Sequence, residues 1–183
     1  AGIGASLVAH IKNTRTPFSI DFGVGDVIVP KQEKRKIPTQ LDDFTSPTVN
    51  TYSLETTIAE KLDAILDLLE FSSRMKDYYD IYYLANKFDF DGATLTKSLK
   101  KTFENRGHAF TIEQFEQVMA FAENDAMQKK WKAFCRKIDT KTDDFNAVLK
   151  TIKEFLIEPF MAVMSEKGFA KKWSGRNNIW REN

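Results

Sequence analysis

The pattern of apolar positions changes near residue 52. Before that point apolar and polar residues alternate, which is typical of strands, and after it apolar residues recur with a period of about 3.6, which is typical of helices. We therefore expect residues 1–52 to form a small sheet and nearly everything after Ser53 to be helical. The strands are predicted at Ala5–Ile11, Phe18–Phe22 and Thr48–Tyr52. This order predicts an α+β fold.

The second of these strands has the sequence FSIDF. Its alternation places the apolar side chains on one face and Ser19 and Asp21 on the other. An aspartate inside a strand is unfavourable by β-propensity, and such a residue often lies where a sheet face lines a site. Gly25 permits a turn directly after the strand, and Asp26 can hydrogen-bond locally there. Val27–Val29 is expected to resume an extended conformation.

The stretch Tyr52–Leu84 is predicted to form two helices joined by a short turn near Phe71–Ser73. Ser53 can cap the first helix. That helix has one apolar stripe, with its acidic residues on the opposite face and Lys61 at the rim of the stripe. The stripe consists of Leu54, Ile58, Leu62, Ile65, Leu66 and Leu69, and the opposite acids are Glu60, Asp63 and Asp67.

The second helix of the pair has an aromatic face and a charged face. The aromatic face holds Met75, Tyr78, Tyr79 and Tyr82; the charged side holds Lys76, Asp77 and Asp80, with Arg74 in the first turn. Two interpretations stay open from spacing alone. The charges can form a solvated face with weak ion pairs, and Lys61 can be a snorkelling side chain. Alternatively, the carboxylates and cations can hold a metal–triphosphate.

The remaining chain is predicted to be helical, with a boundary between two parts: residues 1–88 form an α+β part and residues 89–183 a helical extension. Asp91 can cap a helix that ends near Asn105–Gly107, and Thr111 with Gln114 has the pattern of a capping box. Later helices are expected at Asp125–Ile138 and Asp143–Ser165, followed from Gly168 by a basic aromatic tail.

Composition narrows the class of protein. The chain has 183 residues with a formal net charge of +1, which is too balanced to indicate nucleic-acid binding by itself. The single Cys135 fits a reducing compartment, no apolar run approaches the ~20 residues that span a bilayer, and no signal-peptide pattern is present. We therefore expect a cytoplasmic protein with no membrane partner. Because the chain opens AGIGASLVAHIKN without Met, we expect it to be the C-terminal portion of a longer protein.

Three segments together resemble one family. The first pair is AEKLDAI followed by SRMKDYYDIYYL, and the third, upstream, is PFSIDFGVGDVIVP. These resemble the paired C-terminal motifs and the middle motif of the AbiEii/AbiGii-type nucleotidyltransferase toxins, in the family's order, over about Ile3 to Phe90. The resemblance implies part of a nucleotidyltransferase sheet followed by a mainly helical region. It also implies an enzyme that uses an NTP and Mg²⁺, with a cognate antitoxin as partner.

The resemblance also implies roles for single residues. Asp21 would be a catalytic carboxylate and metal ligand, and Lys61 would contact nucleotide phosphate and be catalytic. Asp80 would be a second catalytic carboxylate, whereas Asp26 would hold the turn. The motif R-x-K-D-x-x-D adds the nucleotide-binding residues Arg74, Lys76 and Asp77. The family's upstream acid-x-acid pair is not in this sequence, so we expect the chain alone to form an incomplete site.

Three functions are weighed. The first is a metal-dependent nucleotidyltransferase that acts on an RNA, tRNA ends included, or on a protein hydroxyl, as the toxin of a bacterial toxin–antitoxin or phage-defence system. The second is an inactive transferase-like module that binds a protein or RNA, and the third is a structural fragment. The enzyme requires Asp21, Lys61 and Asp80 to converge in space. Three basic stretches can contact an RNA acceptor, through its phosphates and by stacking of its bases on Trp131 and Trp173. Alternatively, they are solvated helix faces. These stretches are Lys97–Lys101, Lys129–Lys137 and Lys171–Arg176.

Overall fold

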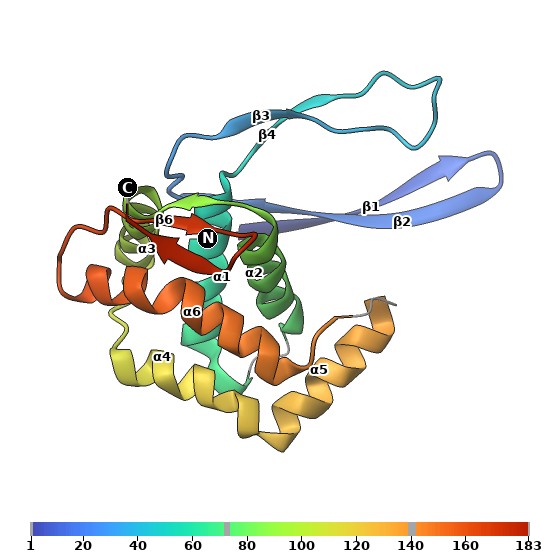
Figure 1. The fold of residues 1–183 in the computed structure, drawn as a ribbon. Helices are drawn as coiled ribbons and strands as arrows, with labels where there is room; N and C mark the ends of the chain where they lie inside the picture. Colours follow the sequence, from blue (N-terminus) through green and yellow to red (C-terminus); the bar gives the residue numbers. More distant parts are fainter. Residues whose placement is uncertain (1, 72–73, 139–141, 183) are drawn as a thin grey trace.

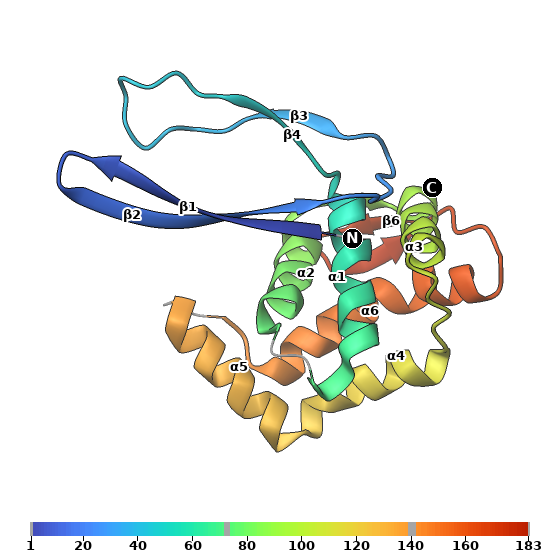
Figure 2. The same ribbon diagram turned by 180° about the vertical axis from the view of Figure 1, so that it is seen from behind.

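The structure, a computed structural model, describes residues 2–71, 74–138 and 142–182. Two hairpins and a helical body make up the molecule, and both hairpins project from the same side of that body (Figures 1 and 2). The first hairpin pairs β1 (Gly2–Ile11) with β2 (Thr14–Gly23), and the second pairs β3 (Glu33–Lys36) with β4 (Thr48–Thr51). Both are antiparallel two-stranded sheets, and they do not pair with each other.

The predicted strands are confirmed, with changed limits. β1 and β2 are longer than expected because the turn takes only Lys12 and Asn13, and Lys12 has the positive φ of 52° that such a tight turn needs. Val27–Val29 belongs to no strand. Instead the backbone N–H of Val29 donates to Thr56 Oγ1 over 3.0 Å. The chain after the first hairpin is thus fastened to the beginning of the helix pair.

In the described residues, the helical body begins at α1 (Leu54–Leu68) and α2 (Met75–Lys87). It continues through α3 (Gly92–Arg106), α4 (Ile112–Met119), α5 (Asp125–Ile138) and α6 (Phe145–Met164). Short 3-10 turns follow α1 and α4, at Leu69–Phe71 and Ala120–Glu123. The side chains of Ser53 and Asp91 accept hydrogen bonds at the helix starts as predicted, and Thr111 with Gln114 forms the capping box. The predicted turn near Phe71–Ser73 lies partly outside the described residues.

The mixed content, 52% helix and 20% strand, confirms the α+β class. A continuous cluster of buried side chains draws on both parts of the chain. Ile58 and Leu62 of α1 lie in it together with Leu95 of α3 and Phe155 of α6, all with no exposed surface. Helix α1 packs against α3, and α2 packs against α6. The boundary at residue 88 stays a prediction, although the core extends across it.

The expectation that nearly everything after Ser53 is helical was wrong for the C-terminal tail. Strand β6 (Lys172–Ser174) pairs with β7 (Ile179–Arg181) on one side and with the short β5 (Phe90–Asp91) on the other. The cause is the burial of tryptophan: Trp173 is 1% exposed, and its Nε1 donates to the carbonyl of Ala85 over 2.7 Å. The tail therefore closes the core beside α6.

Within residues 2–71, 74–138 and 142–182, no helix combines the length and the apolar character needed to cross a membrane.

Candidate functional site

The helix pair brings Lys61 of α1 to two carboxylates of α2. Lys61 Nζ lies 2.9 Å from Asp77 Oδ1 and 2.6 Å from Asp80 Oδ2. The Lys61 side chain is 17% exposed and that of Asp77 only 4%, so this contact is largely shielded from water. Lys61 is therefore not a snorkelling side chain, because its ammonium group points back to the neighbouring helix.

Two further cations complete what we call the Lys61 cluster, which consists of Lys61, Arg74, Lys76, Asp77 and Asp80. Arg74 Nε lies 2.5 Å from Asp77 Oδ2, and Lys76 Nζ lies 2.5 Å from Asp80 Oδ2. Each carboxylate of the cluster thus contacts two cations. With three cations against two carboxylates, the cluster has an excess of positive charge.

The ionisation of Lys61 follows from these contacts. Burial acts to lower the pKa of Lys61, but the hydrogen bonds to Asp80 and Asp77 outweigh it and leave that pKa above its ordinary value. Lys61 is therefore a cation at neutral pH. It is suited to bind an anion rather than to act as a general base.

A cavity of about 260 Å³ opens beside the Lys61 cluster. It is lined by side chains from α1, from the start of α2 and from the end of α3: Tyr52, Thr57, Glu60, Lys61, Ala64, Arg74 and Arg106. Three of these side chains are cations, and Glu60 is a carboxylate. The hydroxyl groups of Tyr52 and Thr57 already donate to Asp26 Oδ2 and to the carbonyl of Ser53. The excess of cations makes the lining complementary to a phosphate-bearing ligand.

The turn of the middle motif is held at this cavity. Tyr52, which lines the cavity, donates its hydroxyl to Asp26 Oδ2 over 2.5 Å. This hydrogen bond, assisted by burial, raises the pKa of Tyr52. The amide of Asn105, in the last turn of α3, donates to the carbonyl of Gly25 over 2.9 Å. Asp26 therefore binds a tyrosine at the cavity, and its turn-holding role stays a prediction.

Asp21 lies near the end of β2, opposite Gly4 of β1. Its side chain is exposed, and its Oδ1 would lie 3.3 Å from a methyl group placed on Gly4. Within the described ranges, no hydrogen bond or ion pair joins Asp21 to the Lys61 cluster, and no three or more metal-binding side chains gather into a group. The convergence of Asp21 with Lys61 and Asp80 stays a prediction.

The acidic face of α1 is partly covered by α3. Asp63 was expected on a face opposite the apolar stripe, but its side chain has no exposed surface. Arg106 Nη1 lies 2.8 Å from Asp63 Oδ2, and His108 Nδ1 lies 2.9 Å from Asp63 Oδ1. Burial raises the pKa of Asp63 against the opposing effect of the His108 hydrogen bond. Arg106 also forms an ion pair with Glu60.

No local feature of α1 or α3 indicates this contact. Arg106 follows Asp63 by 43 positions, and no pattern in α1 predicts which helix will cover its acidic face. The signal that existed was Gly107, which has φ of 69° and ends α3 directly after Arg106. Its presence fixed where the helix stops, but not what the last side chain would meet.

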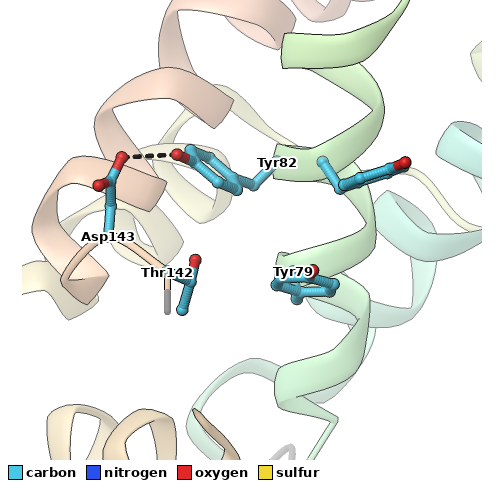
Figure 3. A pocket seen from close by; sticks show the side chains of 5 residues that line it. Tyr79, Tyr82, Thr142 and Asp143 are labelled. Atoms are coloured by element: carbon cyan, nitrogen blue, oxygen red, sulfur yellow. Dashed lines mark hydrogen bonds between the residues drawn. The ribbon is translucent and has the colours of Figure 1, made fainter. Parts of the chain in front are cut away.

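A second cavity, of about 340 Å³, lies on another side of α2 and has a different chemistry. Figure 3 shows Tyr79 and Tyr82 of α2 on one side and Thr142 and Asp143 on the other, with the Tyr82 hydroxyl bonded to Asp143 Oδ2 at 2.5 Å. Burial, followed by this hydrogen bond, raises the pKa of Tyr82 to about 12. The described lining residues include no cation, so this cavity is poorly suited to a triphosphate.

The two tryptophans of the basic stretches are not available for stacking. Trp131 is 2% exposed and Trp173 is 1% exposed. Trp131 Nε1 donates to the carbonyl of Asp143, as Trp173 does to that of Ala85. Both indoles belong to the core, and any contribution of the basic stretches to RNA binding must come from their charges.

The comparisons with known proteins give one positive result. Residues 3–156 match the family model described as the nucleotidyl transferase AbiEii toxin of type IV toxin–antitoxin systems. No curated protein and no solved structure matches the chain. The matched region includes both hairpins, the Lys61 cluster and the end of α3 that bears Arg106, and it covers more than half of the sequence. The chain therefore belongs to the AbiEii family of nucleotidyl transferase toxins.

Proposed function

We propose that the cavity beside the Lys61 cluster binds the triphosphate of an NTP, and that the protein transfers a nucleotide from it to a hydroxyl of an RNA, tRNA included. The observation that supports this most directly is the lining of the cavity. Lys61 and Arg74, which belong to the two C-terminal motifs of the family, face one space together with a third cation, Arg106. A protein hydroxyl is the alternative acceptor.

The carboxylates of the cluster would act as positioning groups. An ammonium group has three N–H donors, and Asp77 and Asp80 accept two of those of Lys61, which leaves one for a phosphate oxygen. Because Asp77 is almost fully buried, the ammonium group is held in place before the ligand arrives. Pre-organisation of this kind reduces the entropy that binding would otherwise cost.

Mg²⁺ would accompany the nucleotide, where it would neutralise charge on the phosphates. Asp21 is the candidate ligand from this chain. Mg²⁺ commonly binds one or two carboxylates and completes its shell with substrate phosphates and water, so a single exposed carboxylate is compatible with such a site. The fastening of the turn after β2 to Tyr52 and Asn105 supports a position of Asp21 toward the cavity.

Helix α5 is the best candidate to meet an RNA acceptor. Its charged side chains include Lys129, Lys132 and Arg136, and within the described ranges none of these three forms an ion pair with a carboxylate. The positive charge of the stretch Lys97–Lys101 is partly neutralised, because Lys100 and Lys101 pair with Glu104.

A cytoplasmic location and a cognate antitoxin as partner are parts of the same proposal, as is a role in phage defence.

The function is tested by transfer of label from each of four [α-³²P]NTPs, with Mg²⁺, to total bacterial RNA by the full gene product. We expect labelled RNA with the natural sequence and a loss of at least about a hundredfold with Lys61→Ala, because a positioned cation on the transferring phosphates typically contributes on that scale. Lys150→Ala, which removes an equal charge outside the cavity and outside the three basic stretches, should retain activity. Equal labelling by the Lys61 and Lys150 variants would contradict the role of the cavity.

A further inference from the structure

Arg106 reaches the cavity from the half of the chain that contains none of the three matched motifs. It is the last residue of α3, and Gly107 in the left-handed conformation stops the helix directly behind it. Its guanidinium group pairs with Asp63 at 2.8 Å and with Glu60, while 35% of its side chain remains exposed and lines the cavity beside Lys61 and Arg74. A cation at this end of a helix is also favoured by the helix dipole.

We propose that Arg106 is a phosphate-binding residue of this cavity, which acts with Lys61 on the triphosphate of the NTP; this inference rests on the proposed function. A guanidinium group has five N–H donors in one plane. The contacts to Asp63 and Glu60 use one donor on Nη1 and one on Nη2, so three remain for a ligand. Arginine is also the cation best matched to two oxygens of one phosphate.

The anchor of Arg106 is unusually well fixed. Asp63 is fully buried and is held on its other oxygen by His108 at 2.9 Å. Glu60 is 16% exposed and holds the second arm of the fork. Asp63 and Glu60 therefore hold the guanidinium group in place before an anion binds. Because the group is already ordered, binding does not have to offset the entropy of ordering it.

The position of α3 also supports a phosphate-binding role for Arg106. Asn105, directly before Arg106, holds the carbonyl of Gly25 in the turn of the middle motif. The end of α3 thus touches the middle-motif turn and α1 at once, and it brings a cation to the place where they meet. If Arg106 served only to neutralise buried Asp63, its loss would lower stability and leave the affinity for anions unchanged.

The test is calorimetric titration of the full gene product with inorganic tripolyphosphate, which probes the cavity without a base, and with each NTP in the presence of Mg²⁺. Arg106→Gln should weaken the binding of tripolyphosphate and NTP by about tenfold to a hundredfold, the scale of a hydrogen bond between charged groups. Lys101→Gln, on the same helix and paired with Glu104, is the matched control and should bind like the natural chain.

If Arg106→Gln fails to fold, two further variants test whether Arg106 binds phosphate. Arg106→Lys keeps a charge next to Asp63 but loses the planar fork, so it should fold and bind about threefold to tenfold more weakly. Glu60→Gln keeps a side-chain oxygen that can accept from Arg106 Nη2 but removes the single carboxylate among the described lining residues. It should therefore tighten binding by about threefold, the effect of one charge across ~6 Å of water.

The outcomes separate the inference from the function on which it rests. If Lys61→Ala loses tripolyphosphate while both Arg106 variants bind it like the Lys101 control, the inference is wrong and the proposed function stands. If the natural chain binds neither tripolyphosphate nor any NTP, the proposed function fails, and the inference fails with it. Unchanged affinity in Glu60→Gln would likewise contradict an anion held next to Arg106.

Discussion

At the scale of residues, the Lys61 cluster illustrates how burial changes the meaning of an ion pair. Lys61 and Lys76 both contact Asp80 Oδ2, at 2.6 and 2.5 Å. The Lys61 side chain is 17% exposed, whereas that of Lys76 is 71% exposed. Nearly equal distances therefore describe two different interactions. The contact of Lys61 is shielded and linked to buried Asp77, and the contact of Lys76 is screened by water.

This difference predicts unequal effects on stability. Lys61→Met should lower the free energy of unfolding by about 2 kcal/mol, because it leaves Asp77 with one fewer partner in a site nearly closed to water. Lys76→Met should change it by no more than about 0.5 kcal/mol, the usual scale of an exposed pair at this spacing. Urea denaturation monitored by circular dichroism measures both, and equal values for the two variants would contradict the shielding argument.

The residues of the site differ in how far their sequence context could reveal them. Spacing on α2 placed Lys76 next to Asp80, because neighbours on one helix face follow from the helical period. The motifs identified Lys61 and Arg74 as candidates, but not that one ammonium group would bridge Asp77 and Asp80. Arg106 could not be found, since its contact with Asp63 depends on how α3 packs against α1.

At the scale of elements, the strands after α6 show a limit of period analysis. The segment β6–β7 is short, basic and rich in polar residues, so it has no strong alternation from which strands could be predicted. It is ordered by tertiary contacts. Trp173 and Trp180 pack on Phe155 of α6 with ring centroids 4.9 and 5.9 Å away. The predicted helices, by contrast, had caps and apolar stripes within their own sequence.

A glycine in this segment tests the close packing of the tail. A methyl group on Gly175 would lie 2.5 Å from the carbonyl oxygen of Phe88 and 3.0 Å from that of Ala85. Both neighbours are backbone atoms at the end of α2 and cannot rotate away. Gly175→Ala should therefore cost about 2 kcal/mol, within the range of overpacked positions.

Gly168→Ala is the matched control, because nothing lies within 4 Å of a methyl group placed there and the residue is exposed. Thermal unfolding followed by circular dichroism compares the two variants. We expect a lower melting temperature for Gly175→Ala and none of this loss for Gly168→Ala. Equal melting temperatures would mean that the tail is not packed on α2 as closely as the structure describes.

At the scale of the whole molecule, the two hairpins and the helical body differ in burial. The strands β1 and β2 contain no buried residue, and large apolar side chains such as Ile3 and Ile11 are 69% and 74% exposed. The helical body, in contrast, shares one core between α1, α2, α3 and α6. The change of period near residue 52 coincides with this difference in burial, and the boundary at residue 88 stays a prediction.

The last prediction compares two truncated chains that test these two divisions. A chain of residues 52–183 loses both hairpins but retains the Ser53 cap and the whole shared core, so we expect native helix content and a cooperative thermal transition. A chain of residues 89–183 loses α1 and α2, which pack on α3 and α6, and it uncovers Phe145, whose ring contacts Tyr78 of α2. Because that apolar surface would then meet water, we expect little fixed structure and no cooperative transition.

Circular dichroism melts of the two truncated chains distinguish the two divisions. A cooperative transition of residues 89–183 would show that they form an independent helical domain, and it would support the boundary near residue 88. Failure of residues 52–183 to fold would instead show that the hydrogen bonds of Val29 to Thr56 and Ser53 are needed to start α1.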